Sequence, residues 1–209
     1  MTAFRILAAM IVCMLAVPAY SQVENKDYRL LDPAQPTSHS GRVEVIEFFS
    51  YGCPHCYAMH PLLKAWAEHL PDNAVLVRVP ISLGHREWGQ LSRAYYALES
   101  MGELARLDDE LFKALHEQKR RLYDEDSIVA WAAEQGIDEK KFRAVFNSSE
   151  ISAKAFRAEE MARNYKVSGV PYLAVAGKYN VLGRTYEEML ANARKLIDKS
   201  ASEKQASNR

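Results

Sequence analysis

Residues Val43–Cys56 read VEVIEFFSYGCPHC, and this stretch decides the fold of a chain of 209 residues. Its first half is rich in β-branched and aromatic side chains, which favours a buried strand. Beyond it, apolar side chains recur at steps of three and four residues, the spacing of an amphipathic helix; they are Met59, Leu62, Leu63 and Trp66. The pair Cys53 and Cys56 therefore stands where a strand gives way to a helix.

The overall composition narrows the range of functions. The chain carries 27 basic and 27 acidic side chains, so it has no net positive charge with which to attract a nucleic acid. Its hydrophobic fraction of 48% is too high for a disordered chain, and 209 residues suffice to bury a core. We therefore expect a folded protein that has no nucleic-acid partner.

Residues 1–21 are predicted to be a secretory signal peptide. Arg5 precedes an unbroken apolar run of 12 residues, which is shorter than the roughly 20 residues needed to span a bilayer. Ala19 and Ser21 supply the small residues of a cleavage site after Ser21. Cleavage after Ala19 and an uncleaved anchor are the alternatives. Export would place the rest of the chain, with its single pair of cysteines, in an oxidising compartment.

The chain after the signal peptide is predicted to form one α/β domain interrupted by an all-helical domain. The α/β domain comprises residues 22–84 and 160–200, and the inserted helical domain comprises residues 85–159. Only helical patterns occur within the insertion, and glycines such as Gly136 mark helix ends. Residues 201–209 are polar and are predicted to form a flexible tail.

Within the α/β domain, strands are expected on both sides of the insertion. Residues 22–41 read as an irregular lead-in. A capping box from Thr185 to Glu188 opens a last helix that is predicted to end at Lys199. Strands are predicted at residues 43–50 and 74–81, and a hairpin at residues 171–176 and 179–182.

Two cysteines separated by two residues carry the strongest chemical signal in the sequence. Cys53 would lie at a helix N-terminus, where free N–H groups and the helix dipole favour a thiolate. The dipole alone contributes at most about 2 kcal/mol, or roughly 1.5 pKa units. A larger effect needs hydrogen bonds or a charged neighbour, and His55 can be that neighbour. A stabilised thiolate favours the reduced dithiol, which makes the disulfide an oxidant.

Other uses of the cysteine pair remain open at this point. The pair can form a purely structural disulfide, or it can hold zinc with His60 as a third ligand. The chain has no second cysteine pair to complete a zinc site, so we predict no metal. A c-type haem requires a histidine directly after the second cysteine, where Tyr57 stands instead.

Glu47 is a second candidate for a functional role. By the period of two it shares a strand face with the apolar residues Val45 and Phe49. A carboxylate on such a face is costly to bury unless it is paired. Two interpretations are open: Glu47 carries a proton for a buried Cys56, or it is a partly exposed strand acid that pairs with Arg78 of the neighbouring strand.

The block EFFSYGCPHCY, from Glu47 to Tyr57, together with the distant pair Val170-Pro171, resembles the DsbA family of exported thiol:disulfide oxidases. The resemblance covers almost the whole chain after the signal peptide, and it implies a thioredoxin fold with an inserted helical domain. It also implies that Cys53 is the exposed sulfur that a substrate thiolate attacks, and that Cys56 is its buried resolving partner.

The same resemblance assigns roles to the residues around the pair. Pro54 and His55 would tune the redox couple, His55 by stabilising the Cys53 thiolate. Pro171 would be cis and face the disulfide, while Val170 would offer backbone hydrogen bonds to an extended substrate peptide. Glu47 matches the buried acid of the family.

His60 departs from the family pattern. The position four residues after the second cysteine is an acid in the best-known members, so the resemblance does not fix the charge near the couple, nor the redox potential and substrate preference that depend on it. Arg78 stands in place of a lysine near Glu47, which preserves a positive charge.

These observations predict a protein dithiol oxidase that donates its Cys53–Cys56 disulfide to reduced, unfolded exported proteins. The resemblance implies a monomer in the periplasm of a Gram-negative bacterium, reoxidised by a DsbB-like membrane partner linked to quinones, without any metal or organic cofactor. The alternatives are a disulfide isomerase or reductase that uses the same pair, a metal carrier, and a holdase that binds peptides beside Pro171 without turnover.

Overall fold

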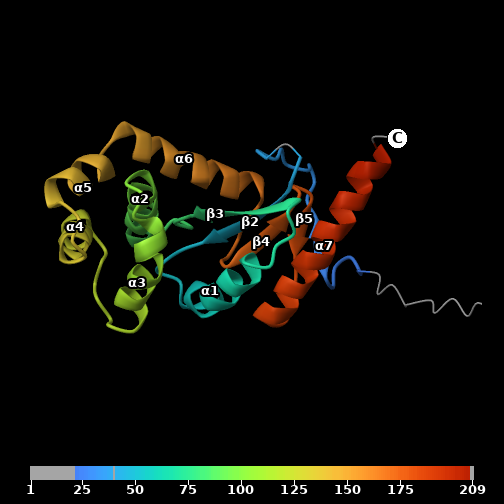
Figure 1. Ribbon diagram of the computed structural model, residues 1–209, viewed down its shortest axis with the longest axis horizontal. Helices are drawn as coiled ribbons and strands as arrows, with labels where there is room; N and C mark the ends of the chain where they lie inside the picture. The colour runs from blue at the N-terminus through green and yellow to red at the C-terminus, as the bar shows by residue number, and fades with distance from the viewer. Residues whose placement is uncertain (1–21, 40, 208–209) are drawn as a thin grey trace, which may run out of the picture.

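The computed structural model describes residues 22–39 and 41–207, so the predicted signal peptide lies outside the described residues. A single sheet has the strand order β1-β5-β4-β2-β3, in which β2 and β3 are parallel and the other neighbours are antiparallel (Figure 1). Its strands are β1 (Tyr28–Leu30), β2 (Val43–Phe49), β3 (Ala74–Pro80), β4 (Tyr172–Val175) and β5 (Tyr179–Val181).

In the described part of the chain, helices lie between the strands and after them, in the order that the sequence predicts. None of those in the described part of the chain is long and apolar enough to cross a bilayer. They are α1 (Pro54–Ala67), α2 (Arg86–Ser100), α3 (Leu104–His116), α4 (Glu125–Glu134), α5 (Glu139–Phe146), α6 (Ser149–Asn164) and α7 (Tyr186–Ser207).

The sheet is covered on both faces, and β2 is buried along its whole length. Successive side chains of β2 point to opposite faces of the sheet. Val45 packs with residues of α1 and α7, whereas Ile46 and Phe48 pack with residues of α6. Figure 1 shows α1 and α6 on opposite sides of the sheet. Because β2 is paired on both sides and buried throughout, the loop that follows it, with both cysteines, starts from a firmly held strand.

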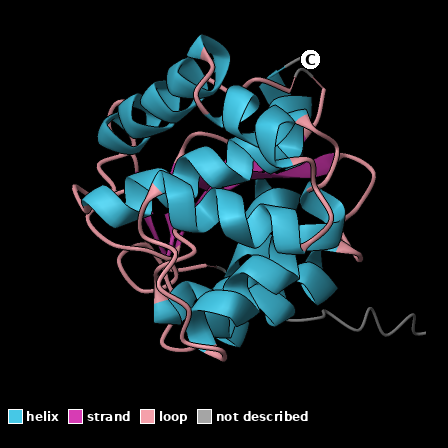
Figure 2. Cartoon of the chain, turned by 90° about the vertical axis from the view of Figure 1, so that its left-hand side faces the viewer, coloured by secondary structure: helices cyan, strands magenta, loops and turns pink. Residues whose placement is uncertain are grey.

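Helices α2 to α6 form the insertion, since they lie between β3 and β4 in the chain. Figure 2 shows these helices in front of the sheet. A cluster of buried side chains joins the insertion to the end of β2 and to the cysteines, and it includes Phe49, Tyr51, Cys56 and Phe112. The active-site loop is therefore held by both parts of the molecule.

Two segments differ from the prediction. The lead-in contains strand β1, which pairs with β5, and Tyr28 packs edge-on against Tyr179 with ring centroids 5.1 Å apart. Helix α7 continues to Ser207, beyond the predicted end at Lys199 and through most of the predicted tail. Glu203 on this extension accepts hydrogen bonds from Lys178 and Tyr179 of the hairpin. Both differences depend on contacts with segments far away in the sequence, which local patterns do not reveal.

Candidate active site

The cysteine pair lies at the junction that the sequence predicts. Strand β2 ends at Phe49 and helix α1 begins at Pro54, with Cys53 as the residue that caps the helix. Both cysteines are in the free thiol form. Pro54 takes the first helical position, where its missing N–H leaves no hydrogen bond unmade.

The two thiols have opposite electrostatic environments. A hydrogen bond from Cys56, the backbone N–H groups of Cys56 and His55, and the charge of His55 lower the pKa of Cys53 to about 6, against the opposing effect of burial. Burial, reinforced by the neighbouring Cys53, raises the pKa of Cys56 well above its ordinary value. At neutral pH the pair therefore holds one thiolate, on Cys53, and one thiol.

Val170 and Pro171 lie against the pair, although they follow it by more than a hundred residues. The Val170-Pro171 peptide bond is cis, and the Cys53 Sγ atom lies 3.4 Å from the Val170 carbonyl oxygen, a hydrogen bond that Cys53 can donate only in its protonated form. The expected exposed sulfur is not found, since only 4% of Cys53 is exposed, compared with 0% of Cys56.

The two residues between the cysteines are exposed to solvent. The His55 Nδ1 atom lies 3.1 Å from the hydroxyl group of Tyr186, the first residue of α7. Tyr186 is thus a neighbour of the site that the sequence analysis did not identify. Its position at a helix start far along the chain carries no local signal.

We expect the Cys53 thiolate to titrate with a midpoint near pH 6, compared with the ordinary value of 9.0. The stabilisation that the lowered pKa gives to the reduced protein is complete above the ordinary thiol range, and it is lost as the pH falls through about 6. Thiolate absorbance in the ultraviolet, or the rate of alkylation against pH, measures the midpoint.

The source of this shift can be tested by matched variants of Cys56. Cys56→Ser keeps a hydrogen-bond donor and is expected to retain most of the lowered Cys53 pKa, whereas Cys56→Ala removes the donor and should raise that pKa. Equal midpoints in the two variants would contradict the role of the hydrogen bond.

Glu47 is completely buried and is paired with Arg78. The two residues stand in register on the parallel strands β2 and β3, and the Arg78 Nε atom donates to a Glu47 carboxylate oxygen at 2.6 Å. The predicted pair with Arg78 is therefore present, but the partial exposure that this interpretation assumed is wrong, because Glu47 is 0% exposed. Glu47 still influences the cysteine pair, because its charge is one of the factors that raise the pKa of Cys56.

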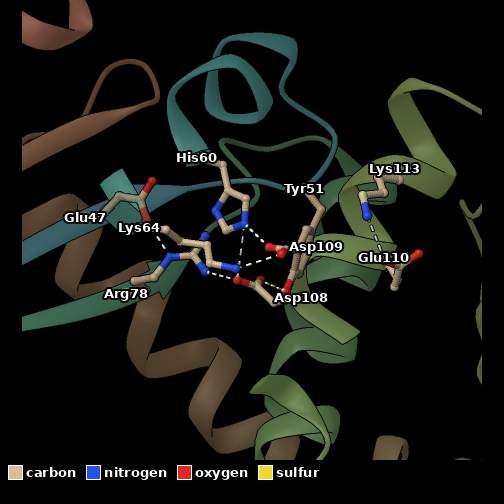
Figure 3. Close-up of polar contacts among 9 residues, drawn as sticks. All are labelled: Glu47, Tyr51, His60, Lys64, Arg78, Asp108, Asp109, Glu110 and Lys113. Atoms are coloured by element: carbon tan, nitrogen blue, oxygen red, sulfur yellow. Dashed lines mark hydrogen bonds and ion pairs between the residues drawn. The ribbon is translucent and has the colours of Figure 1, made fainter. Parts of the chain in front are cut away.

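Helix α3 of the insertion adds a carboxylate that the sequence analysis missed (Figure 3). Asp108 accepts hydrogen bonds from the Arg78 Nη1 atom at 2.6 Å and from the Tyr51 hydroxyl group at 2.5 Å. A signal was present, because Asp108 follows Leu104 by one helical turn and so interrupts the apolar stripe of α3. The pairing partners could not be read from that pattern.

His60 belongs to this polar network and does not join the cysteines. It is buried, and its Nε2 atom lies 2.7 Å from an oxygen of Asp109 and 3.6 Å from an oxygen of Asp108. Among the described residues, the group that brings His60 within metal-binding geometry contains these two acids and neither cysteine. Lys64 and Arg78 already pair with the same carboxylates. The zinc site formed by Cys53, Cys56 and His60 that the sequence left open is therefore wrong.

Gly52 allows Trp88 of α2 to pack directly against the active-site loop. A Cβ atom at position 52 would overlap the indole Nε1 atom and would lie 2.6 Å from the Cδ1 atom of Trp88. We expect Gly52→Ala to lower the free energy of unfolding by about 1–3 kcal/mol through overpacking. Urea denaturation measures this loss.

Gly89→Ala is the matched control for this prediction. Gly89 lies within α2, and a Cβ atom there would come no closer than 3.8 Å to the nearest heavy atom outside its own helix, in Ser82. It is expected to leave stability unchanged or to raise it by up to about 1 kcal/mol, since alanine favours a helix interior. Equal losses in both variants would show that the packing at position 52 is not special.

A cysteine pair at a helix N-terminus, beside the Val170-Pro171 segment and just after an inner strand of a mixed sheet, defines a thiol:disulfide oxidoreductase of the thioredoxin fold. The family model described as a DSBA-like thioredoxin domain matches residues 44–195. The chain belongs to this family. The predicted fold class, a thioredoxin fold with a helical insertion, is thereby confirmed.

Relatives and solved structures agree with this assignment. The chain is 34% identical to the thiol:disulfide interchange protein DsbA of Bordetella parapertussis, over 91% of this chain and 90% of that protein. A crystal structure of Pseudomonas aeruginosa DsbA matches with a TM-score of 0.81 at 35% identity, covering 88% of this chain and 95% of that one. The oxidoreductase DsbA from Xylella fastidiosa matches with a TM-score of 0.82 at 28% identity, covering 87% and 98%.

Proposed function

We propose that this oxidoreductase acts as an oxidase, donating a Cys53–Cys56 disulfide to reduced, unfolded exported proteins. The observation that carries the proposal is the position of Cys53 at the N-terminus of α1, where a hydrogen bond from Cys56 and backbone N–H groups lower its pKa to about 6, while Cys56 stays protonated. A stabilised thiolate lowers the free energy of the reduced protein, and so favours transfer of the disulfide to a substrate.

The transfer takes place in two exchanges. A substrate thiolate attacks the Cys53 sulfur, forms a mixed disulfide and releases Cys56, which takes up a proton. A second substrate thiolate then attacks the substrate sulfur of the mixed disulfide, and Cys53 leaves as a thiolate. A low leaving-group pKa speeds this second step. The substrate ends as a disulfide and the enzyme as a dithiol, so the electrons balance.

The neighbouring residues have distinct roles in this scheme. His55 stabilises the Cys53 thiolate through its backbone N–H and its charge, and Pro54 keeps the first helical turn regular. Val170 and Pro171 hold the substrate chain beside Cys53. Glu47 keeps negative charge near Cys56 and exchanges the proton that Cys56 gains and loses.

The cellular setting is proposed from the sequence. The signal-peptide pattern of residues 1–21 supports export to the periplasm, where the domain of residues 22–84 and 160–200, with its helical insertion 85–159, acts as a monomer. Reoxidation of the dithiol requires an electron acceptor, and a DsbB-like quinone-linked membrane protein would supply it.

Equilibration in glutathione buffers tests the proposed direction of transfer. We expect the oxidised fraction to give a potential well above that of the glutathione couple, since the disulfide is made to be donated. A potential below about −300 mV, the range of structural disulfides, would instead indicate an inert bridge or a reductase.

A further inference from the structure

A cavity of about 490 Å³ adjoins the redox pair on the side of the helical insertion. Its lining includes Gly52 and Pro54, which are the two chain neighbours of Cys53. A polypeptide joined to the Cys53 sulfur therefore lies next to this cavity. The mechanism above does not use it, because Val170 and Pro171 are not part of its lining.

The far wall of the cavity comes from the connection between α3 and α4, where Arg121 and Tyr123 contribute to the lining. Every second residue of this connection, at positions 120, 122 and 124, holds it in place. Arg120 pairs with Glu134, with its Nη2 atom donating at 2.9 Å, and Leu122 is buried in the core. Asp124 forms the capping box of α4.

Arg121 and Tyr123 alternate with these three residues and take no part in the contacts that hold the connection. Tyr123 is 44% exposed, so its ring is accessible to a ligand. Within the described residues, the backbone N–H groups of residues 121–123 donate no hydrogen bond to another backbone group. The connection thus presents one aromatic ring and free backbone donors on a rigid support, which are features that bind an extended peptide.

The remaining lining adds two aromatic rings, Trp88 and His116, to that of Tyr123. Trp88 forms one wall, and the His116 ring is held in place by its Nε2 contact with the Tyr51 carbonyl oxygen at 2.7 Å. The charged groups of the lining, Glu87 and Arg121, have opposite signs, so the cavity does not attract either charge strongly. The Arg121 guanidinium lies 5.9 Å from the centre of the Tyr123 ring and can also contact the face of a bound ring.

We propose that this cavity binds an aromatic side chain of the substrate polypeptide, adjacent to the cysteine that attacks Cys53. The inference rests on the proposed oxidase function and adds a substrate preference to it: reduced chains with Tyr, Trp or Phe beside the reacting cysteine are oxidised faster. An aromatic pair contributes about 0.5–1.5 kcal/mol beyond its buried area, which corresponds to about twofold to tenfold in kcat/KM.

The test compares peptide dithiols that differ only at the residue beside the attacking cysteine, which is Tyr, Leu or Ala. Dithiothreitol is the control substrate, because it has no amino-acid side chain that the cavity could bind. The wild-type protein is expected to oxidise the Tyr peptide about twofold to tenfold more efficiently than the Ala peptide. Tyr123→Ala should remove most of this preference, and Tyr123→Phe should keep it.

Two controls separate the cavity from general effects. Phe156→Ala removes another exposed aromatic side chain, 59% exposed on α6, that does not line the cavity, and it should preserve the preference. Dithiothreitol oxidation should be equal in all variants, which also verifies that each is folded. A preference for Tyr that survives in Tyr123→Ala, or equal rates for the Tyr, Leu and Ala peptides in the wild type, would overturn the inference. Failure to oxidise dithiothreitol would overturn the proposed oxidase function instead.

Discussion

Cys53→Ser is expected to reduce the oxidation of protein dithiols to the uncatalysed rate. The substrate must form a bond to a sulfur at this position, and a serine hydroxyl cannot form a disulfide. The effect should be complete, since Cys53 and Cys56 are the only cysteines among the described residues. Recovery of activity from reduced, unfolded substrate proteins, followed over time, measures the loss.

Cys56→Ser is the companion variant, and its expected result is different. Cys53 keeps its thiolate and can still form a mixed disulfide with an oxidised substrate, but the resolving thiol is absent. Covalent complexes with substrates should therefore accumulate and be visible by non-reducing electrophoresis. If Cys53→Ser kept the main activity on unfolded proteins, the protein would be a peptide-binding holdase whose function does not require exchange.

Arg78→Met is expected to cause the largest loss of stability among single substitutions near the site. It leaves Glu47, which is 0% exposed, without its ion-pair partner, and it also removes a partner of Asp108. Breaking a buried ion pair in this way costs about 3–5 kcal/mol, because the remaining charge has neither water nor a counter-charge. Urea denaturation of the reduced protein at neutral pH measures the difference.

The double variant Glu47→Gln with Arg78→Met tests the cause. It removes both charges, so much of the lost stability should return. Equal stability of the single and double variants would show that Arg78 acts through packing, such as its guanidinium 4.1 Å from the Phe49 ring centre, and not through charge.

Local patterns in the sequence were sufficient for most of the elements near the site. The β-branched run of β2, the helical spacing in α1 and the turn between β4 and β5 each lie within a few consecutive residues, and the structure has all three. The cysteine spacing also predicted the redox chemistry, because a short stretch of chain is enough to place two sulfurs close together at a helix N-terminus. The proton-carrier and ion-pair interpretations of Glu47 could not be separated in the same way, since the answer depended on β3.

The environment of the pair depended on segments that meet only in the folded protein. Asp108 reaches Arg78 from a helix of the insertion, Tyr186 reaches His55 from the start of α7, and Trp88 packs on Gly52 from α2. Hydrogen bonds and ion pairs act over a few ångströms in space, whatever the separation along the chain. The sequence alone therefore determined which residues react, whereas the tertiary structure decided which charges and surfaces surround them.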